Sequence, residues 1–220
     1  MSELLLIAAS GLAREVLAMV RSSGPFDVVG ILDDDEDKLG RVVDGAHVLG
    51  PIREAMNYPH ALLLICIGTG SGRESVVLRL RALGLAEDRY ATAIDPSVHV
   101  PEGCVIGRGS IILAHVSMTA SVTIGNHVVA MPGVTFTHDD VIGDYATLAS
   151  GVSLGGNVHI GRAAYLGMNA SVRERLSIGA KATIGMGAAV LADVPEDETW
   201  AGVPARVIRR GNSPALEGAQ

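Results

Sequence analysis

Few aromatic residues and few cysteines occur in this chain, and each shortage narrows the kind of protein it can be. Aromatic residues make up 3% of its 220 residues, which suits thin, uniform layers better than one large core filled with rings. The two cysteines, Cys66 and Cys104, have neither the spacing of a metal site nor the number of a disulfide framework. We expect both to be small packed residues rather than reactive thiols.

Long apolar runs and long basic runs are also missing. No stretch approaches the roughly 20 apolar residues that span a bilayer, and the N-terminus "MSELLLIAAS" begins acidic where a secretory signal begins basic. A net charge of −7 without a Lys/Arg run leaves no surface that releases counterions from nucleic-acid phosphates. We therefore expect a cytoplasmic protein that binds neither membrane nor nucleic acid.

A period of six residues dominates the second half of the chain. Every sixth residue is large and apolar, with the exception of Ala130, in the series Ile94, Val100, Ile106, Ile112, Met118, Ile124, Ala130, Phe136, Ile142, Leu148, Leu154, Ile160, Leu166, Val172, Ile178, Ile184 and Val190. The residue two positions earlier is mostly small or Val, except at Asp140 and Leu176. Glycine follows the large residue every eighteen positions, at Gly107, Gly125, Gly143, Gly161 and Gly179. This pattern predicts a solenoid with three six-residue segments per turn.

The segments "IGNHVV", "IGDYAT", "IGRAAY", "IGAKAT" and "IGMGAA" resemble the repeat of the hexapeptide-repeat acyltransferases. That resemblance implies a left-handed parallel β-helix of triangular section. The hand does not follow from the period, because parallel crossovers are usually right-handed. A right-handed or noncatalytic solenoid is the alternative.

The first ninety residues follow a different pattern, with buried strands expected at 4–10, 26–35 and 61–68 and helices at 11–24 and 72–84. Such alternation predicts a small parallel sheet that binds ligands beyond the carboxyl ends of its strands. At that edge lie Ser10, Gly11, Asp33, Asp34, Gly68, Thr69 and Gly70. The first turn, "AASGLA", has one glycine where a dinucleotide site needs three, which excludes NAD. The turn suits a phosphate and the two acids suit a base or ribose, although a tight turn and a solvated acidic loop explain these residues equally well.

Both halves together resemble the sialic acid O-acyltransferase (NeuD-type) family over roughly residues 3 to 210, through "ASG" at 9–11, "LDD" at 32–34, "IGTG" at 67–70 and the repeats. The resemblance implies a Rossmann-like βαβαβ domain at 1–92, a left-handed β-helix at 93–198, and a C-terminal cap and tail at 199–220, with "GNSPALEGAQ" disordered. It implies a nucleotide-linked sugar bound by Ser10, Gly11, Asp33, Asp34, Gly68 and Thr69. Two residues depart from the family, Leu12 in place of a frequent His and Met131 in place of a frequent Asn.

The same resemblance implies catalysis by His138 and Asp139 in "FTHDDVIGD", a signal that would be weak without the family. The histidine removes a proton from the attacking amine or hydroxyl, and Asp139, in preference to Asp140, holds the imidazole tautomer. A glycine N–H donates to the thioester oxygen. Gly143 is the expected donor, with Gly155 and Gly156 as alternatives.

Acetyl-coenzyme A is the cosubstrate that the resemblance implies, in a groove between two β-helices of a homotrimer and without a metal. Gly161, Gly167, Gly179 and Gly185 are expected to stack along that groove. The segment "WAGVPARVIRR" is expected to contact the adenine end through Gly202, Pro204, Ala205 and Arg206, with Arg206 or Arg209 facing phosphates. It can equally cap the last coil.

These features predict an acetyl-CoA-dependent N-acetyltransferase that acts on the amino group of a nucleotide-linked amino sugar. One alternative is an O-acetyltransferase that acts on a sugar, sialic acid or another hydroxylated metabolite. A remoter one is a zinc-dependent protein of the carbonic anhydrase kind, but His115, His127, His138 and His159 lack the spacing of its ligands. The sequence does not determine the nucleotide base, the sugar, whether an amine or a hydroxyl is acetylated, or the length of the acyl chain.

Overall fold

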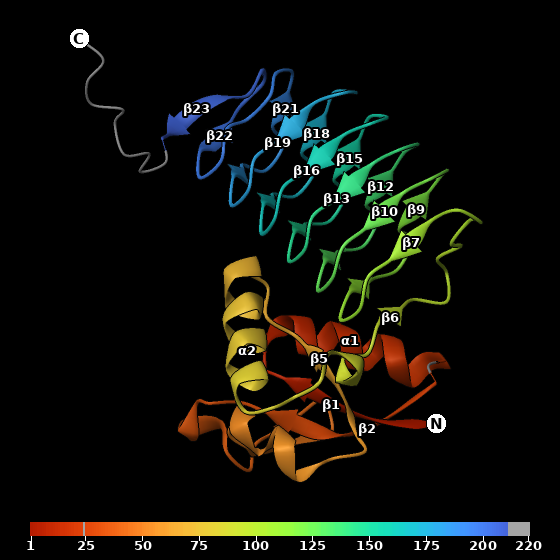
Figure 1. The fold of residues 1–220 in the computed structure, drawn as a ribbon, viewed down its shortest axis with the longest axis vertical. Coiled ribbons are helices and arrows are strands. Elements are labelled where there is room, and N and C mark those ends of the chain that lie inside the picture. The colour runs from red at the N-terminus through yellow and green to blue at the C-terminus, as the bar shows by residue number, and fades with distance from the viewer. Residues whose placement is uncertain (24, 211–220) are drawn as a thin grey trace.

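The computed structural model describes residues 1–23 and 25–210, which form an α/β domain followed by a parallel β-helix (Figure 1). This two-part architecture confirms the fold predicted from the alternation of strands and helices and from the period of six. The tail "GNSPALEGAQ", expected to be disordered, lies outside the described residues.

The α/β domain is built around β1 (Ser2–Ile7), which lies between β2 (Phe26–Leu32) and β5 (Leu62–Ile65), and all three are parallel. Alternate residues of β1 face opposite sides of the sheet. Leu4 and Leu6 pack in a cluster with α1 (Gly11–Ser23), whereas Leu5 and Ile7 pack in a cluster with α2 (Gly70–Ala82). The unbroken apolar run of β1 is therefore explained by helices on both faces.

The sheet has five strands in the order β3-β4-β2-β1-β5, two more than predicted. The additional strands, β3 (Val42–Val43) and β4 (Ala46–Gly50), form a hairpin whose turn residues Asp44 and Gly45 have φ angles of 41° and 79°. An Asp-Gly pair is a strong hairpin signal that the prediction missed. The predicted Rossmann-like domain is confirmed, with the connection between β2 and β5 made by this hairpin and the short helices η1 (Glu36–Lys38) and η2 (Ile52–Asn57) rather than by an α-helix. A third short helix, η3 (Glu87–Arg89), leads to the β-helix.

Two-residue strands form the three faces of the β-helix. Partners such as Thr123 and Val141 are eighteen residues apart, so one coil contains three strands, as predicted. The first face contains β7 (Val105–Ile106), β10 (Thr123–Ile124), β13 (Val141–Ile142), β16 (His159–Ile160) and β19 (Ser177–Ile178). The second contains β6 (Ala93–Ile94), β8 (Ile111–Ile112), β11 (Val129–Ala130), β14 (Thr147–Leu148), β17 (Tyr165–Leu166), β20 (Thr183–Ile184) and β22 (Thr199–Ala201). The third contains β9 (Ser117–Met118), β12 (Thr135–Phe136), β15 (Ser153–Leu154), β18 (Ser171–Val172) and β21 (Ala189–Val190).

The edges between faces place one residue in six in the left-handed conformation. Asp139, Tyr145 and Ala163 have φ angles of 62°, 61° and 55°, and glycine occupies the equivalent position at Gly109, Gly133, Gly151 and Gly187. This conformation costs most residues roughly 1–2 kcal/mol. The stacked coils therefore hold these residues in the left-handed conformation, which few of them favour intrinsically.

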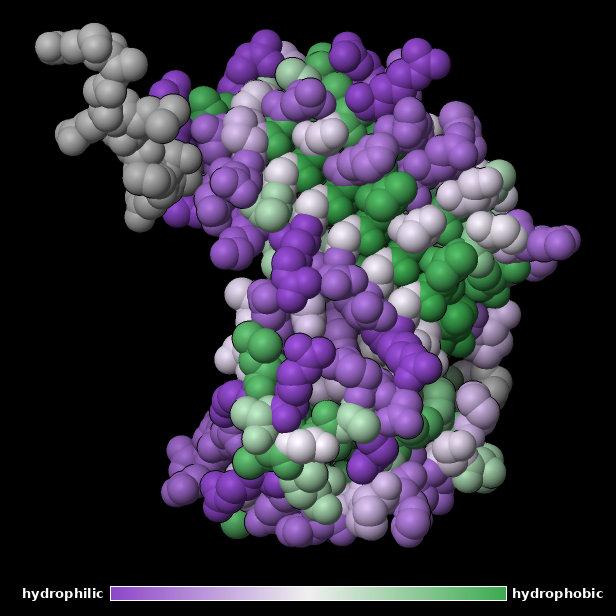
Figure 2. All heavy atoms as spheres, in the orientation of Figure 1, coloured by the Kyte–Doolittle hydropathy of each residue, from purple (hydrophilic) through white to green (hydrophobic). Residues whose placement is uncertain are grey.

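The series of large residues fills the interior of the β-helix, where Phe136 and Leu148 have no exposed surface. Ile94, the first member, is instead 39% exposed, because the first coil has no coil beneath it. The last coil is closed by an antiparallel hairpin of β22 and β23 (Arg206–Arg209). Apolar residues reach the visible surface of the β-helix as regular rows (Figure 2). None of the helices in the described part of the chain is both long and apolar enough to cross a membrane.

Candidate active site

His138 and Asp139 lie on the edge between the third and first faces, which we call the catalytic edge. Phe136 and Ile142 on either side point into the core, so the turn between them presents His138 to solvent with 65% of its side chain exposed. The imidazole Nδ1 lies 2.9 Å from an Asp139 carboxylate oxygen. With Nδ1–H donating to Asp139, the lone pair of Nε2 is directed away from the pair and can accept a proton.

Gly156 lies one coil further along the same edge, where Asn157 N–H donates to the His138 carbonyl over 2.8 Å. A Cβ atom on Gly156 would lie 2.3 Å from Nε2 of His138, so the imidazole can keep this position only beside a glycine. Among the described residues, no acceptor is recorded for the Gly156 N–H. Gly156 is therefore next to the imidazole and is a candidate to donate its N–H to an oxyanion.

The expected preference for Gly143 as oxyanion donor is not supported by this geometry. Gly143 follows β13 and lies on the edge between the first and second faces, and its N–H donates to Ile160 O over 2.7 Å. The N–H of Gly155 donates to Val172 O over 2.9 Å. Of the three expected donors, Gly156 alone combines the correct edge with a free N–H among the described residues.

Asp140 lies behind the catalytic edge, fully buried. One carboxylate oxygen accepts the Thr137 N–H over 2.8 Å and the other accepts the Val158 N–H over 2.9 Å. Burial raises the pKa of Asp140 to about 6, although these two N–H groups oppose the shift. This acid breaks the small-residue pattern because it bonds the turn that carries His138 to the next coil, and the sequence did not predict that role.

Gly161, Gly167, Gly179 and Gly185 form two stacks rather than the single one expected. Gly161 and Gly179 follow first-face strands, whereas Gly167 and Gly185 follow second-face strands. All four N–H groups donate to the next coil over 2.7–2.8 Å, and an added Cβ would approach that coil to within 2.3–2.8 Å. Close stacking of coils accounts for these glycines, and their contact with a cosubstrate stays a prediction.

The C-terminal segment closes the last coil, which is one of the two roles expected for it. Ala205 is 1% exposed, and its N–H donates to Ala189 O over 2.8 Å. Pro204 and Arg206 are exposed beside it, while Arg209 Nε donates to Thr199 Oγ1 over 3.3 Å. The methyl group of Ala205 belongs to the core, so the exposed Arg206 is the better candidate for a coenzyme contact.

The strand ends of the α/β domain meet as the sequence predicted. Ser10 Oγ donates to Cys66 O over 2.6 Å and accepts the Ala13 N–H over 3.2 Å, which joins the start of α1 to the end of β5. Asp33 accepts the Ala9 N–H over 2.7 Å. Burial alone would raise the pKa of Asp33, but its bonds to backbone N–H groups and to Lys38 together lower it. An added Cβ would meet no atom within 4 Å at Gly11 or Gly68, so the surface there is open.

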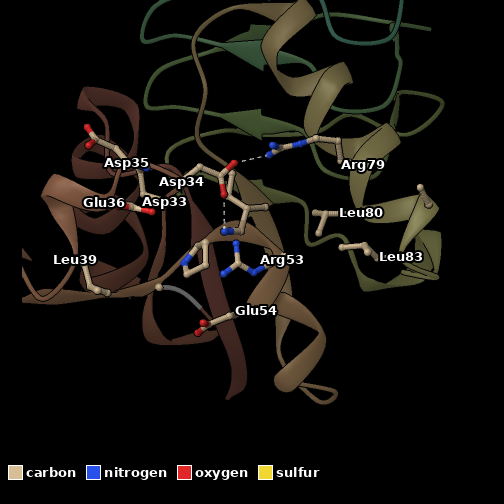
Figure 3. A pocket seen from close by; sticks show the side chains of 14 residues that line it. Asp33, Asp34, Asp35, Glu36, Leu39, Arg53, Glu54, Arg79, Leu80 and Leu83 are labelled. Atoms are coloured by element: carbon tan, nitrogen blue, oxygen red, sulfur yellow. Dashed lines mark hydrogen bonds and ion pairs between the residues drawn. The ribbon is translucent and has the colours of Figure 1, made fainter.

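A cavity of about 970 Å³ lies over the ends of β2 and β4 and beside the second half of α2. Of the expected substrate residues, Asp33 and Asp34 line it, whereas Ser10, Gly11, Gly68 and Thr69 do not. In Figure 3, Arg79 of α2 points to Asp34, and the ion pair measures 2.7 Å. The second Asp34 oxygen accepts the Ile52 N–H over 2.9 Å. The volume suits a nucleotide-sized ligand. Its lining includes three residues that the sequence did not predict because they come from other elements, namely Arg53, Glu54 and Arg79.

Leu12 and Met131, the two departures from the family, belong to one hydrophobic cluster that joins α1 to the second face. Leu12 is 8% exposed, and Met131 is partly buried against the cluster. Met131 follows the second-face strand β11, so it lies on a different edge from His138. Among the described residues, no group of three His, Cys, Asp or Glu side chains is arranged to hold a metal ion.

Known proteins resemble both parts of the chain. The PglD N-terminal domain family matches residues 3–80. The UDP-N-acetylbacillosamine N-acetyltransferase of Bacillus subtilis is 41% identical over 56 residues. That match spans 26% of this chain and 24% of the Bacillus protein, so less than a quarter of the curated relative is covered.

Solved structures match almost the whole chain. PerB from Caulobacter crescentus, determined with CoA and GDP-perosamine, is 28% identical with a TM-score of 0.84, over 94% of this chain and 97% of PerB. The acetyltransferase domain of PglB from Neisseria gonorrhoeae is 25% identical with a TM-score of 0.85, over 94% of this chain and all of that domain (100%). The β-helix is therefore left-handed, as predicted. A PglD-type N-terminal domain is thus joined to this β-helix, and over almost its whole length the chain is similar to these two-domain acetyltransferases.

Proposed function

We propose that the protein is an acetyl-CoA-dependent N-acetyltransferase that acts on the amino group of a nucleotide-linked amino sugar. The observation that carries this proposal is the outward His138–Asp139 pair, joined at 2.9 Å, beside Gly156, whose N–H has no recorded acceptor within residues 1–23 and 25–210. The nucleotide-sized cavity of the α/β domain supports a nucleotide-linked substrate. The complex of PerB with CoA and GDP-perosamine supports both substrates.

In the proposed reaction, the unprotonated amine attacks the thioester carbonyl and His138 Nε2 accepts the amine proton as the C–N bond forms. Asp139 holds the other ring nitrogen and stabilises the imidazolium. The Gly156 N–H donates to the oxyanion. When the C–S bond breaks, His138 returns the proton to the coenzyme A thiolate, so the base is regenerated. General base catalysis of this kind contributes about 10² to 10⁴-fold in rate.

The arrangement within one chain supports a homotrimer. The α/β domain packs against the edge between the first and second faces, near Tyr145, whereas His138 lies on a different edge. A substrate held by the α/β domain of one chain is therefore best served by His138 of a neighbour, and a head-to-tail contact with a rotation of one third of a turn forms a closed ring of three. Acetyl-coenzyme A would lie between neighbouring β-helices, within reach of Arg206. Light scattering should give a mass of about three times 22.7 kDa.

Thiol release from acetyl-coenzyme A tests the function directly, with UDP-, dTDP- and GDP-linked 4-amino sugars as acceptors. We expect turnover with one of them and an amide product by mass spectrometry, with turnover lost in His138→Ala. The base and sugar are read from the member that reacts. Turnover only with hydroxylated sugars, giving an ester, would replace this proposal by O-acetylation.

A further inference from the structure

A fully buried arginine lies at the junction of the two parts, outside the residues discussed so far. Arg73 lies in the first turn of α2 and has no exposed surface. Its guanidinium makes six hydrogen bonds of 2.7–3.0 Å, to Ile67 O, Gly68 O, His127 O, Tyr145 O, Ala146 O and Thr147 Oγ1, one of them bifurcated because the two N–H groups of Nη2 serve three acceptors. All six acceptors are uncharged. Burial lowers the pKa of Arg73 to about 10, so the group stays charged at neutral pH.

The acceptors come from two places that the guanidinium joins. Ile67 and Gly68 form the loop after β5, which leads to the expected substrate residue Thr69. The other four acceptors lie on the edge between the first and second faces, on two successive coils. Thr147 Oγ1 itself donates to Gly68 O over 2.9 Å. The loop is thus held to the β-helix both directly and through Arg73.

Docking of the two parts does not by itself require a buried charge. Burying an arginine is costly unless its donors are all satisfied, and an apolar residue of similar volume often serves as well. A second link already joins the same surfaces, because the exposed Arg162 pairs with Glu74 over 2.7 Å and lies 4.5 Å from the centre of the Tyr145 ring. What distinguishes Arg73 is its pair of bonds to the loop carbonyls.

Those two bonds fix the direction of two N–H groups. A trans peptide is planar, so its N–H points opposite to its C=O. Holding Ile67 O and Gly68 O therefore aims the N–H groups of Gly68 and Thr69 away from the β-helix. No acceptor for either N–H is recorded among the described residues, and the space beside Gly68 is open. Two parallel, unused N–H groups suit the oxygens of a diphosphate.

We infer that Arg73 is a positioning residue that presets the Gly68 and Thr69 N–H groups for the diphosphate of the nucleotide-linked substrate. This inference rests on the proposed function for the identity of the ligand. It rests on the six hydrogen bonds for the role of the side chain.

The kinetic test uses Arg73→Lys and Thr147→Val, with Glu74→Gln as the matched control. Lysine has three N–H donors where the guanidinium has five, so it cannot hold both loop carbonyls and all four acceptors of the β-helix. Valine removes the hydroxyl bond to Gly68 with little change in volume. We expect the KM for the nucleotide sugar to rise about 10-fold in Arg73→Lys and about 3-fold in Thr147→Val. The kcat and the KM for acetyl-coenzyme A should stay within about 2-fold, and Glu74→Gln should match the wild type. Thr147→Val keeps the test decisive if Arg73→Lys does not fold.

Calorimetric binding of UDP, dTDP and GDP separates this inference from the proposed function. If the preferred nucleotide binds the wild type and weakens by the same factors in the two variants, the inference stands even without turnover of any amino sugar. Turnover and binding that are insensitive to both variants would overturn the inference and leave the proposed function intact. An equal loss in Glu74→Gln would reduce Arg73 to a docking residue, and absence of nucleotide binding in the wild type would overturn the inference.

Discussion

Two histidines of the β-helix show how one repeat supports different chemistry. His138 lies on the catalytic edge with 65% of its side chain exposed, beside Asp139. His127 lies on the edge that the α/β domain covers and is 2% exposed. Its ring stacks on Tyr145 with centroids 5.2 Å apart and meets the edge of Tyr90 at 4.6 Å. Its Nδ1 has no hydrogen-bond partner among the described residues.

Burial, together with the nearby charges of Arg73 and Arg162, lowers the pKa of His127 to about 4. The His127 ring is therefore neutral and packs as an aromatic ring between Tyr90 and Tyr145. His127 occupies the left-handed position of its edge, with a φ angle of 55°, whereas His138 comes one residue before that position, which Asp139 holds. Both side chains leave the coil at an edge, so the repeat does not decide which histidine is exposed. What covers the edge decides it.

The largest effect should come from removing the exposed histidine. His138→Ala should lower kcat by about 10² to 10⁴-fold without changing the melting temperature, since the side chain packs against little. Steady-state thiol release and thermal unfolding measure the two quantities. The exposed His115 lies on the third of the edges, and its replacement by Asn should leave kcat within about 2-fold. A comparable loss in both variants would end the assignment of His138 as the base.

The glycine beneath the imidazole gives the next largest effect. Gly156→Ala would place a methyl group where Nε2 lies, 2.3 Å from the ideal Cβ, and the ring must turn aside. We expect kcat to fall about 10- to 100-fold with the fold intact. In Gly143→Ala the added Cβ would instead meet backbone atoms of the next coil at 2.8 Å, so stability should fall. If both variants lose stability alike, Gly156 serves coil stacking only.

The covered edge should respond to acid through His127. Its pKa is about 4 in the folded state and 6.5 ordinarily. As pH falls from 6.5 to 4, His127 is therefore protonated in the unfolded chain but stays neutral in the folded chain. Roughly 3 kcal/mol of the free energy of unfolding is lost over that window. His127→Phe keeps the stacked ring and should remove this loss. Urea unfolding at pH 7.0 and 4.5 measures the difference between the two proteins, and equal pH dependence in both would contradict the buried neutral histidine.

A smaller effect of opposite sign should appear behind the catalytic edge. The pKa of Asp140 is about 6 in the folded state against an ordinary 3.8, so the unfolded chain loses its proton first and stability declines as pH rises from 3.8 to 6. Asp140→Asn cannot ionise, although its amide can satisfy only one of the two N–H groups. The melting temperature of Asp140→Asn relative to the wild type should therefore improve by a few degrees between pH 4 and 6.5. A difference in melting temperature that stays constant across that range would contradict the raised pKa of Asp140.

The sequence predicted the β-helix because its interior positions recur with a fixed period, as Phe136 and Ile142 illustrate. It identified His138 and Asp139 only through a family resemblance, since an exposed histidine beside acids has no pattern of its own. It favoured Gly143 over Gly156 as the oxyanion donor, because the period gives the coil but not which N–H remains unused. Arg73 had a signal that was overlooked. It lies on the same helical stripe as Val76, Val77 and Leu80, all of which are buried.

The eighteen-residue coil also limits how the length of this chain can change. An insertion of six residues between Tyr145 and Gly156 would turn everything after it by one edge, so Gly156 would no longer lie beside His138. An insertion of eighteen would keep Gly156 on its edge but move it one coil away, a step of about 4.8 Å. Between the coils that contact the α/β domain and the catalytic edge, only insertions or deletions of whole coils therefore keep each residue on its own edge. Every such change still alters the distance along the β-helix between Gly156 and His138.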